Sequence, residues 1–66
     1  MRIRLNGESH PLSRRTSIQA LLDDLGLDSG RVAVELNRRI LKRAEFREAQ
    51  VEDGDEVEVV TFVGGG

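Results

Sequence analysis

The residues best suited to chemistry stand at the C-terminus, where the chain reads Gly64, Gly65, Gly66. Glycine has no side chain to bury and loses the most backbone freedom on ordering, so these residues add nothing to a core. A segment without Cβ atoms fits a slot too narrow for other residues, and a terminal carboxylate is ionised at neutral pH and can attack a phosphate. We therefore predict that Gly66 is the reactive end of the chain. The alternative is an inert, frayed terminus.

The length and composition of the chain limit its size and the other chemistry that it can perform. Sixty-six residues form one small domain, which we place at residues 1–63, with a flexible tail at residues 64–66. The chain has no cysteine, which excludes disulfides, thiolate metal sites and a thiol nucleophile. The only histidine, His10, has no second histidine or cysteine to share a metal with. We expect it to be exposed and no metal to be bound.

Charge and hydropathy argue against two classes of partner. The formal net charge is -2 and the isoelectric point is near 5.3, whereas a nucleic-acid binder normally carries a basic stripe interleaved with aromatic residues. No apolar run approaches the length that spans a membrane, and the first residues alternate in polarity, unlike a signal peptide. We therefore expect a cytoplasmic protein that binds neither nucleic acid nor membrane.

The elements that must position the tail begin with a predicted β-hairpin. Ile3 and Leu5 alternate with polar residues, which is the period of a strand with one buried face. The pair Asn6-Gly7 follows and is typical of a tight hairpin turn. A second strand is expected at residues 8–12.

One helix is predicted next, over residues 16–26. Thr16 and Gln19 have the spacing of a capping box, in which the Thr16 hydroxyl accepts from an early amide and Gln19 reaches back. Apolar residues then recur at helical spacing, and Gly26 can end the helix in the left-handed conformation. The apolar stripe consists of Ile18, Leu21, Leu22 and Leu25. A helix this short needs a sheet beneath its stripe.

The second half of the chain has the pattern of strands and turns. Residues 32–36 and 39–41 are predicted strands on either side of an Asn37-Arg38 turn. Phe46 is the expected anchor of the polar segment that follows, which has room for a single helical turn. Residues 52–55, with glycine at position 54, form a tight turn before the last strand.

The last predicted strand, residues 56–63, leads directly to the glycines and has two unlike faces. If Val57 and Val59 belong to the core, the strand period places Val60 and Phe62 on the solvent-facing side. Two adjacent exposed apolar side chains beside a reactive tail are typical of a docking patch for a partner protein. A bulge that shifts the phase, or a cover over both faces, is the alternative.

Together these elements describe an α+β domain. The predicted architecture is a mixed sheet of four to five strands with one main helix packed on one face. If the first and last strands are neighbours, Arg2 and Arg4 on the outer face oppose Glu56 and Glu58.

Several segments also have a characteristic order and spacing. They are Ile3-Arg4-Leu5-Asn6-Gly7, the helix at residues 16–26, Val32-Ala33-Val34-Glu35-Leu36-Asn37 with Ile40, Val51-Glu52-Asp53-Gly54-Asp55-Glu56-Val57-Glu58, and Val63-Gly64-Gly65-Gly66. With them the whole chain resembles the sulfur carrier proteins of thiamine biosynthesis, which have the ubiquitin-like β-grasp fold. Two residues depart from the family pattern and bear on the geometry of one hairpin: Arg38 stands where glycine is common, and Lys42 where proline is common.

This resemblance implies a carrier and not an enzyme, with no catalytic residue and no bound cofactor of its own. In the family, a ubiquitin-activating-like adenylyltransferase uses ATP and magnesium to adenylate the C-terminal glycine, here Gly66. Sulfur from a cysteine-derived persulfide then converts the acyl-adenylate to a thiocarboxylate. Thiazole synthase finally receives that sulfur.

Three other readings fit the same residues. The small subunit of molybdopterin synthase is a similar sulfur carrier, although such chains tend to be longer. A ubiquitin-like protein modifier would join Gly66 to lysines on target proteins. A plain binding module would use Val60 and Phe62 and have an inert tail.

Overall fold

The computed structural model describes residues 1–62 and contains seven strands and three short helices in that range. The strands are β1 (Arg2–Leu5), β2 (Glu8–Pro11), β3 (Thr16–Ser17), β4 (Val32–Leu36), β5 (Arg39–Leu41), β6 (Gln50–Val51) and β7 (Glu56–Thr61). The helices are α1 (Ile18–Asp24) and two single 3₁₀ turns, η1 (Ser29–Arg31) and η2 (Arg43–Glu45). None of the helices in residues 1–62 is long and apolar enough to cross a membrane.

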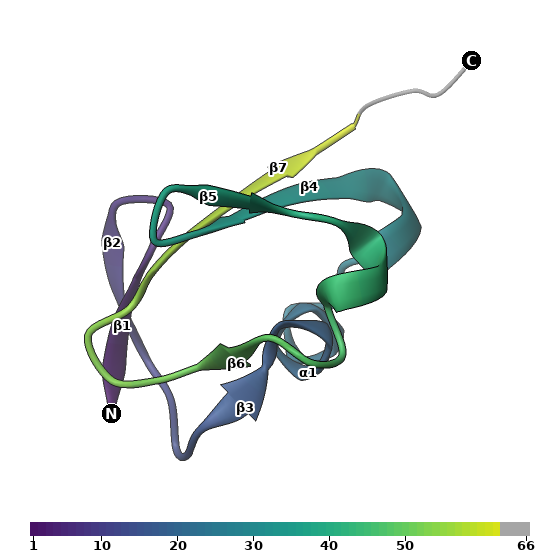
Figure 1. Ribbon diagram of the computed structural model, residues 1–66. Coiled ribbons are helices and arrows are strands. Elements are labelled where there is room, and N and C mark those ends of the chain that lie inside the picture. The colour runs from purple at the N-terminus through teal and green to yellow at the C-terminus, as the bar shows by residue number, and fades with distance from the viewer. Residues whose placement is uncertain (63–66) are drawn as a thin grey trace.

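Five of the strands form one mixed sheet in the order β2-β1-β7-β4-β5. Neighbours in this sheet run antiparallel except β1 and β7, which are parallel. Helix α1 lies across one face of the sheet, and the small β3-β6 ladder lies beside it (Figure 1). This arrangement confirms the predicted α+β class with one main helix on one face of a mixed sheet.

Helix α1 begins later than the capping-box pattern predicts. Thr16 lies in β3, where it pairs with β6, so the prediction that its hydroxyl caps the helix is wrong. Ser17 is the N-cap instead, and its hydroxyl accepts a hydrogen bond from the Ala20 amide at 3.0 Å. Gln19 does not reach back, because its side-chain amide donates to Asp23 at 3.0 Å. Thr16 has the local spacing of a helix cap, but it pairs with a distant segment, β6, and so becomes part of a strand.

The C-terminal end of α1 follows the prediction. Gly26 has a φ of 73°, the left-handed conformation that ends many helices. The Leu27 amide then donates to the Leu22 carbonyl at 2.9 Å, which satisfies a carbonyl at the helix end. Most of the predicted stripe is buried, and Leu25 packs against its edge.

A single core lies between the sheet and α1. Its buried side chains are Ile3, Ile18, Leu21, Leu22, Val32, Val34, Leu41, Phe46, Val51, Val57 and Val59. Phe46, the predicted anchor of the polar segment, is 2% exposed, which confirms that expectation. Phe46 follows η2, whose N-cap is Lys42. The Lys42 amide donates a hydrogen bond to Glu45 Oε1 at 2.8 Å. Proline, which is common at this position in the family, has no amide hydrogen and could not form this bond.

Candidate functional site

Strand β7 and the residue after it alternate between the core and solvent. Val57 is fully buried and Val59 is 9% exposed, whereas Val60 and Phe62 are 59% and 58% exposed. The predicted phase is confirmed, and the described part of the strand has neither a shift of phase nor a cover over both faces. The role of Val60 and Phe62 in docking stays a prediction.

Ile40 on β5 lies on the same exposed face of the sheet, which the sequence pattern did not predict. Its side chain is 74% exposed. Glu35 on β4 lies opposite both Ile40 and Glu58, which puts all three on the same face of the sheet as Val60. We call Ile40, Val60 and Phe62 the outer apolar patch. The period of β5 was the only available signal, and that strand is three residues long.

The predicted reactive residues follow this patch in sequence. Gly64 and Gly65, predicted as the tail, and Gly66, predicted as the modified residue, lie outside the described residues. The described site is therefore the surface that immediately precedes them.

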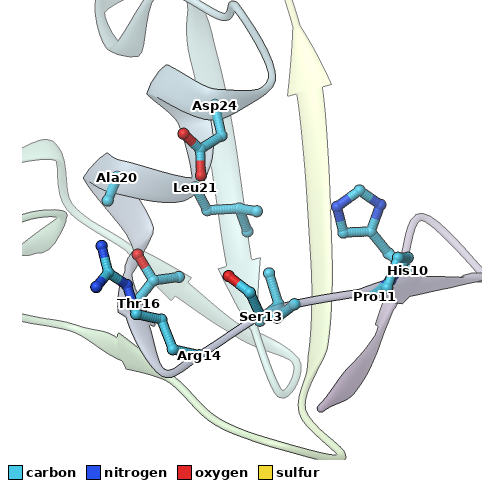
Figure 2. Close-up of a pocket in the computed structure, with 9 residues that line it drawn as sticks. His10, Pro11, Ser13, Arg14, Thr16, Ala20, Leu21 and Asp24 are labelled. Carbon is cyan, nitrogen blue, oxygen red and sulfur yellow. The ribbon is translucent and has the colours of Figure 1, made fainter.

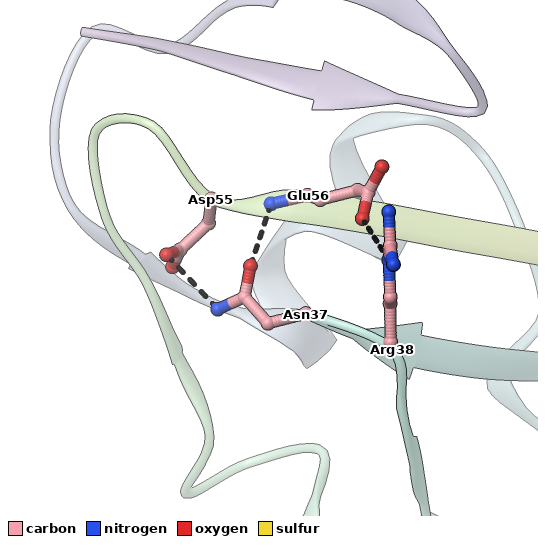
Figure 3. Close-up of polar contacts among 4 residues, drawn as sticks. All are labelled: Asn37, Arg38, Asp55 and Glu56. Carbon is pink, nitrogen blue, oxygen red and sulfur yellow. Dashed lines mark hydrogen bonds and ion pairs between the residues drawn. The ribbon is translucent and has the colours of Figure 1, made fainter.

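Two asparagines hold β7 from opposite sides. Asn6 Oδ1 accepts a hydrogen bond from the Val59 amide at 2.7 Å, and Asn37 Oδ1 accepts one from the Glu56 amide at 2.9 Å. The Asn37 side-chain amide also donates to Asp55 at 3.2 Å (Figure 3). Both asparagines have positive φ, 50° and 52°, a conformation that asparagine adopts more readily than most residues. The strand that leads to the tail is thus fixed by two side chains that the sequence pattern marked only as turn residues.

Removing the Asn6 side chain should weaken the fold. Glycine adopts a φ of 50° without strain, so Asn6→Gly removes the acceptor and leaves the Val59 amide, in a partly buried position, without its partner. We expect the free energy of unfolding to fall by about 1–3 kcal/mol in urea denaturation. Asn6→Asp keeps an oxygen acceptor and should cost less than half as much. Equal losses in the two variants would contradict this role for the hydrogen bond.

The turn between β4 and β5 contains a strained residue. Arg38 follows Asn37 and has a φ of 70°, so both central residues are left-handed, as in a type I′ hairpin turn. That conformation costs a non-glycine residue roughly 1–2 kcal/mol. Arg38 Nε lies 3.4 Å from Glu56 Oε1, but the Arg38 side chain is 86% exposed, so the ion pair offsets little of this cost (Figure 3). The predicted hairpin forms, with strain where the family pattern commonly has glycine.

Arg38→Gly is expected to stabilise the protein. Glycine removes the Cβ clash, but it also adds freedom to the unfolded chain and removes the ion pair, so we expect a net gain of at most about 1 kcal/mol in the free energy of unfolding. Arg39→Gly is the matched control, because Arg39 lies in extended strand β5, where glycine should be destabilising. If chemical denaturation showed Arg38→Gly to be less stable than wild type, the interactions of the Arg38 guanidinium would contribute more free energy than the backbone strain costs.

The ion pairs expected between the first and last strands do not form in residues 1–62. Arg4 lies opposite Glu56 in register, but the ion-pair partner of Glu56 is Arg38. The guanidinium groups of Arg2 and Arg4 instead donate to a hydroxyl and a carbonyl of the β1–β2 hairpin, at 2.7 and 3.1 Å. Strands β1 and β7 pair at two positions only, so β1 ends before it reaches Glu58.

A separate cavity of about 300 Å³ lies between β2 and α1 (Figure 2). Its lining includes His10, Arg14 and Asp24. His10 is partly buried there, so the expectation that it is exposed is wrong. The reason is register, because His10 lies opposite the core residue Ile3 and its side chain takes the inner side of β2. Within the described part of the chain, no three acidic or histidine side chains are placed to hold a metal ion.

A mixed five-stranded sheet with one helix across it, whose last strand is central and leads to the C-terminus, defines a ubiquitin-like β-grasp domain (Figure 1). The site is the exposed end of that strand. Comparison with known proteins then identifies the family: the chain belongs to the ThiS family, which matches residues 3–66. The resemblance drawn from the sequence segments is confirmed.

Solved and curated relatives agree with this assignment. The crystal structure of the thiamine biosynthesis protein ThiS from Geobacter metallireducens has a TM-score of 0.87 and 35% identity, with full coverage of both chains. Sulfur carrier protein ThiS from Thermus thermophilus is 39% identical over 62 residues, 94% of this chain and 95% of that protein. Thiazole synthase from Paramagnetospirillum magneticum is 42% identical over all of this chain, which is 20% of that protein. The chain thus spans about a fifth of the length of the thiazole synthases that it matches.

Proposed function

We propose that this chain is a cytoplasmic sulfur carrier of thiamine biosynthesis and not itself an enzyme. In this account, a ubiquitin-activating-like adenylyltransferase uses ATP and magnesium to activate Gly66. The Gly66 carboxylate attacks the α-phosphate, pyrophosphate leaves, and an acyl-adenylate forms. The outer sulfur of a cysteine-derived persulfide then displaces AMP and forms an acyl disulfide, and a thiol reduces the S–S bond, which leaves a thiocarboxylate on Gly66 and a disulfide on the donor side. Thiazole synthase receives this sulfur for the thiazole ring of thiamine.

The observation that carries the proposal is the family match, because it runs from residue 3 through Gly66. It includes the folded domain and all three terminal glycines. Relatives named sulfur carrier protein from Thermus thermophilus and Bacillus subtilis support the carrier role. Thiazole synthases that contain a matching segment within one polypeptide support the choice of sulfur acceptor.

The outer apolar patch suits the docking step of this scheme. Phe62 precedes Gly66 by four residues, and a four-residue span reaches at most roughly 14 Å. A partner that covers Val60 and Phe62 therefore has the acyl end within reach of a nearby active site. A partner pocket that encloses the glycine segment would keep water from the reactive anhydride. We propose that both partners dock on this patch.

A genetic test separates this function from that of a molybdopterin synthase subunit or a protein modifier. Deleting the gene in the source organism should create a growth requirement that added thiazole alcohol or thiamine relieves. The wild-type chain should restore growth without either supplement, and a chain that lacks Gly66 should not. A deletion that leaves thiamine synthesis intact, or that removes only molybdenum-cofactor activities, would overturn the proposal.

A further inference from the structure

Two glutamates face each other on the outer face of the sheet, next to the outer apolar patch. Glu35 on β4 and Glu58 on β7 are direct partners in the antiparallel ladder, and both are exposed. Side chains that are directly opposite have Cβ atoms about 4.5–5.5 Å apart, and like charges at such positions destabilise a sheet. The free domain therefore carries an unfavourable pair at the centre of this face.

Neither glutamate of this pair has an ion-pair partner in residues 1–62. The three ion pairs in that range use the carboxylates of Asp28, Glu52 and Glu56. The contrast with Glu56 is informative, because that carboxylate, on the same strand, has an arginine 3.4 Å away. The sheet therefore neutralises one outward-facing carboxylate of β7 and leaves the next one facing a like charge.

Glu56, which is paired with Arg38, is the outward-facing neighbour of Glu58 toward the start of β7, and the other neighbours of the pair include apolar residues. Ile40 lies directly opposite Glu35 on the side away from Glu58, and Ala33 lies opposite Val60 in the next outward-facing row. Glu35 lies next to Ile40, and Glu58 lies next to Val60 on the same face of β7, so a protein that covers both apolar side chains must also remove water from the two carboxylates. Burying unpaired carboxylates is strongly unfavourable, so the surface fits only a partner that supplies positive charge at this point.

We propose that Glu35 and Glu58 form one acidic recognition site for basic side chains of thiazole synthase, with the outer apolar patch as its apolar rim. This inference rests on the proposed function. We assign the site to thiazole synthase because two relatives of that name contain a matching segment in the same polypeptide. The site favours one partner over others, because a protein whose docking surface has no arginine or lysine at this point would bury the two carboxylates without a counter-charge.

The proposal gives the pair opposite effects in the free and bound states. Glu35→Gln or Glu58→Gln removes the repulsion, so each single variant should raise the unfolding temperature of the free protein by a few degrees. The double variant should gain little more, because one substitution already abolishes the like-charge contact. For binding to thiazole synthase the direction reverses: the dissociation constant should rise about tenfold or more in each variant, and its dependence on salt should weaken.

The experiment measures unfolding temperature and binding to purified thiazole synthase of the source organism, in parallel, for the full-length wild type and variants. Glu8→Gln is the matched control, because Glu8 is an exposed strand carboxylate on β2, at the far edge of the same sheet. The inference is supported if the Glu35 and Glu58 variants are more stable and bind more weakly while Glu8→Gln binds like wild type.

Each other outcome has a distinct meaning. If wild type and Glu8→Gln bind thiazole synthase and the Glu35 and Glu58 variants bind equally well, the acidic site is refuted and the proposed function stands. If wild type itself does not bind, the proposed acceptor is refuted first. If the variants lose affinity only for the activating enzyme, measured in the same way, the assignment of the site to thiazole synthase is overturned.

Discussion

Deletion of Gly65 and Gly66 should reduce sulfur transfer to background while the shortened protein still binds its activating enzyme. The deletion removes the carboxylate that becomes the acyl-adenylate and shortens the reach of the chain by roughly 7 Å, so the new end falls short of the reacting phosphate. Because the core and the outer apolar patch lie within residues 1–62, stability and docking should change little. Thiazole formation in a reconstituted assay and titration of the activating enzyme measure the two effects separately.

This deletion also separates the carrier from a plain binding module. A binding module that uses Val60 and Phe62 has no need of the glycines, so its biological activity would survive the loss. A reconstituted assay in which the shortened protein still supports thiazole formation would contradict the assignment of Gly66. A shortened protein with a lower unfolding temperature would instead show that the glycines contribute to the fold.

The two phenylalanines of the chain should respond to substitution in opposite ways. Phe62 is 58% exposed, and Phe62→Asp should leave the free energy of unfolding within about 0.5 kcal/mol of wild type. An aromatic anchor at the centre of an interface contributes about 2 kcal/mol or more, so affinity for the activating enzyme should fall roughly thirty-fold. In ATP–pyrophosphate exchange this would be seen as a higher KM for the carrier with a similar kcat.

Phe46→Ala is the contrasting variant. Phe46 is 2% exposed in the core, and its truncation should cost about 3–5 kcal/mol, enough to unfold much of a domain this small. Circular dichroism and chemical denaturation distinguish the two results. If Phe62→Asp unfolds the domain as Phe46→Ala does, Phe62 belongs to the core and the docking patch loses its main residue.

The sequence was most informative where one local period decided the structure. The alternation of Val57 and Val59 with Val60 and Phe62 correctly separated the buried from the exposed face of β7, because a strand period of two leaves no other arrangement. The helical spacing of Ile18, Leu21 and Leu22 identified the buried stripe of α1 for the same reason.

Errors arose where a distant segment competed with a local pattern. Thr16 matched a helix cap, but its pairing with β6 involves a residue far away in the sequence, and no local spacing predicts such a ladder. Likewise, the parallel register of β1 and β7 sets Arg4 against Glu56 and leaves Glu58 facing β4. Alternating apolar and polar residues predict which side chains share a face of a strand. Which residue lies opposite each of them on the next strand depends on the strand order, and the sequence pattern does not give that order.

The parts of the site that were missed have the same origin. Ile40 belongs to a three-residue strand, too short for its period to be significant, and it joins the patch only through the β4–β5 register. Asn6 was predicted as a turn residue, and its hydrogen bond to Val59 follows from the position where β1 stops beside β7. Both features depend on the assembled sheet.

The most direct test of the sulfur-carrier function is the intact mass of the full-length protein after incubation with the activating enzyme, ATP, magnesium, a persulfide sulfur donor and a thiol reductant. A Gly66-deleted chain is treated in the same way. We expect a mass increase equal to the replacement of one oxygen by sulfur, located in the C-terminal peptide and absent from the deleted chain. The same species should be found in protein from a sulfur-replete native host. An unchanged mass under reconstitution, with an activating enzyme shown to be active, would contradict the sulfur-carrier function and favour a modifier or a binding module.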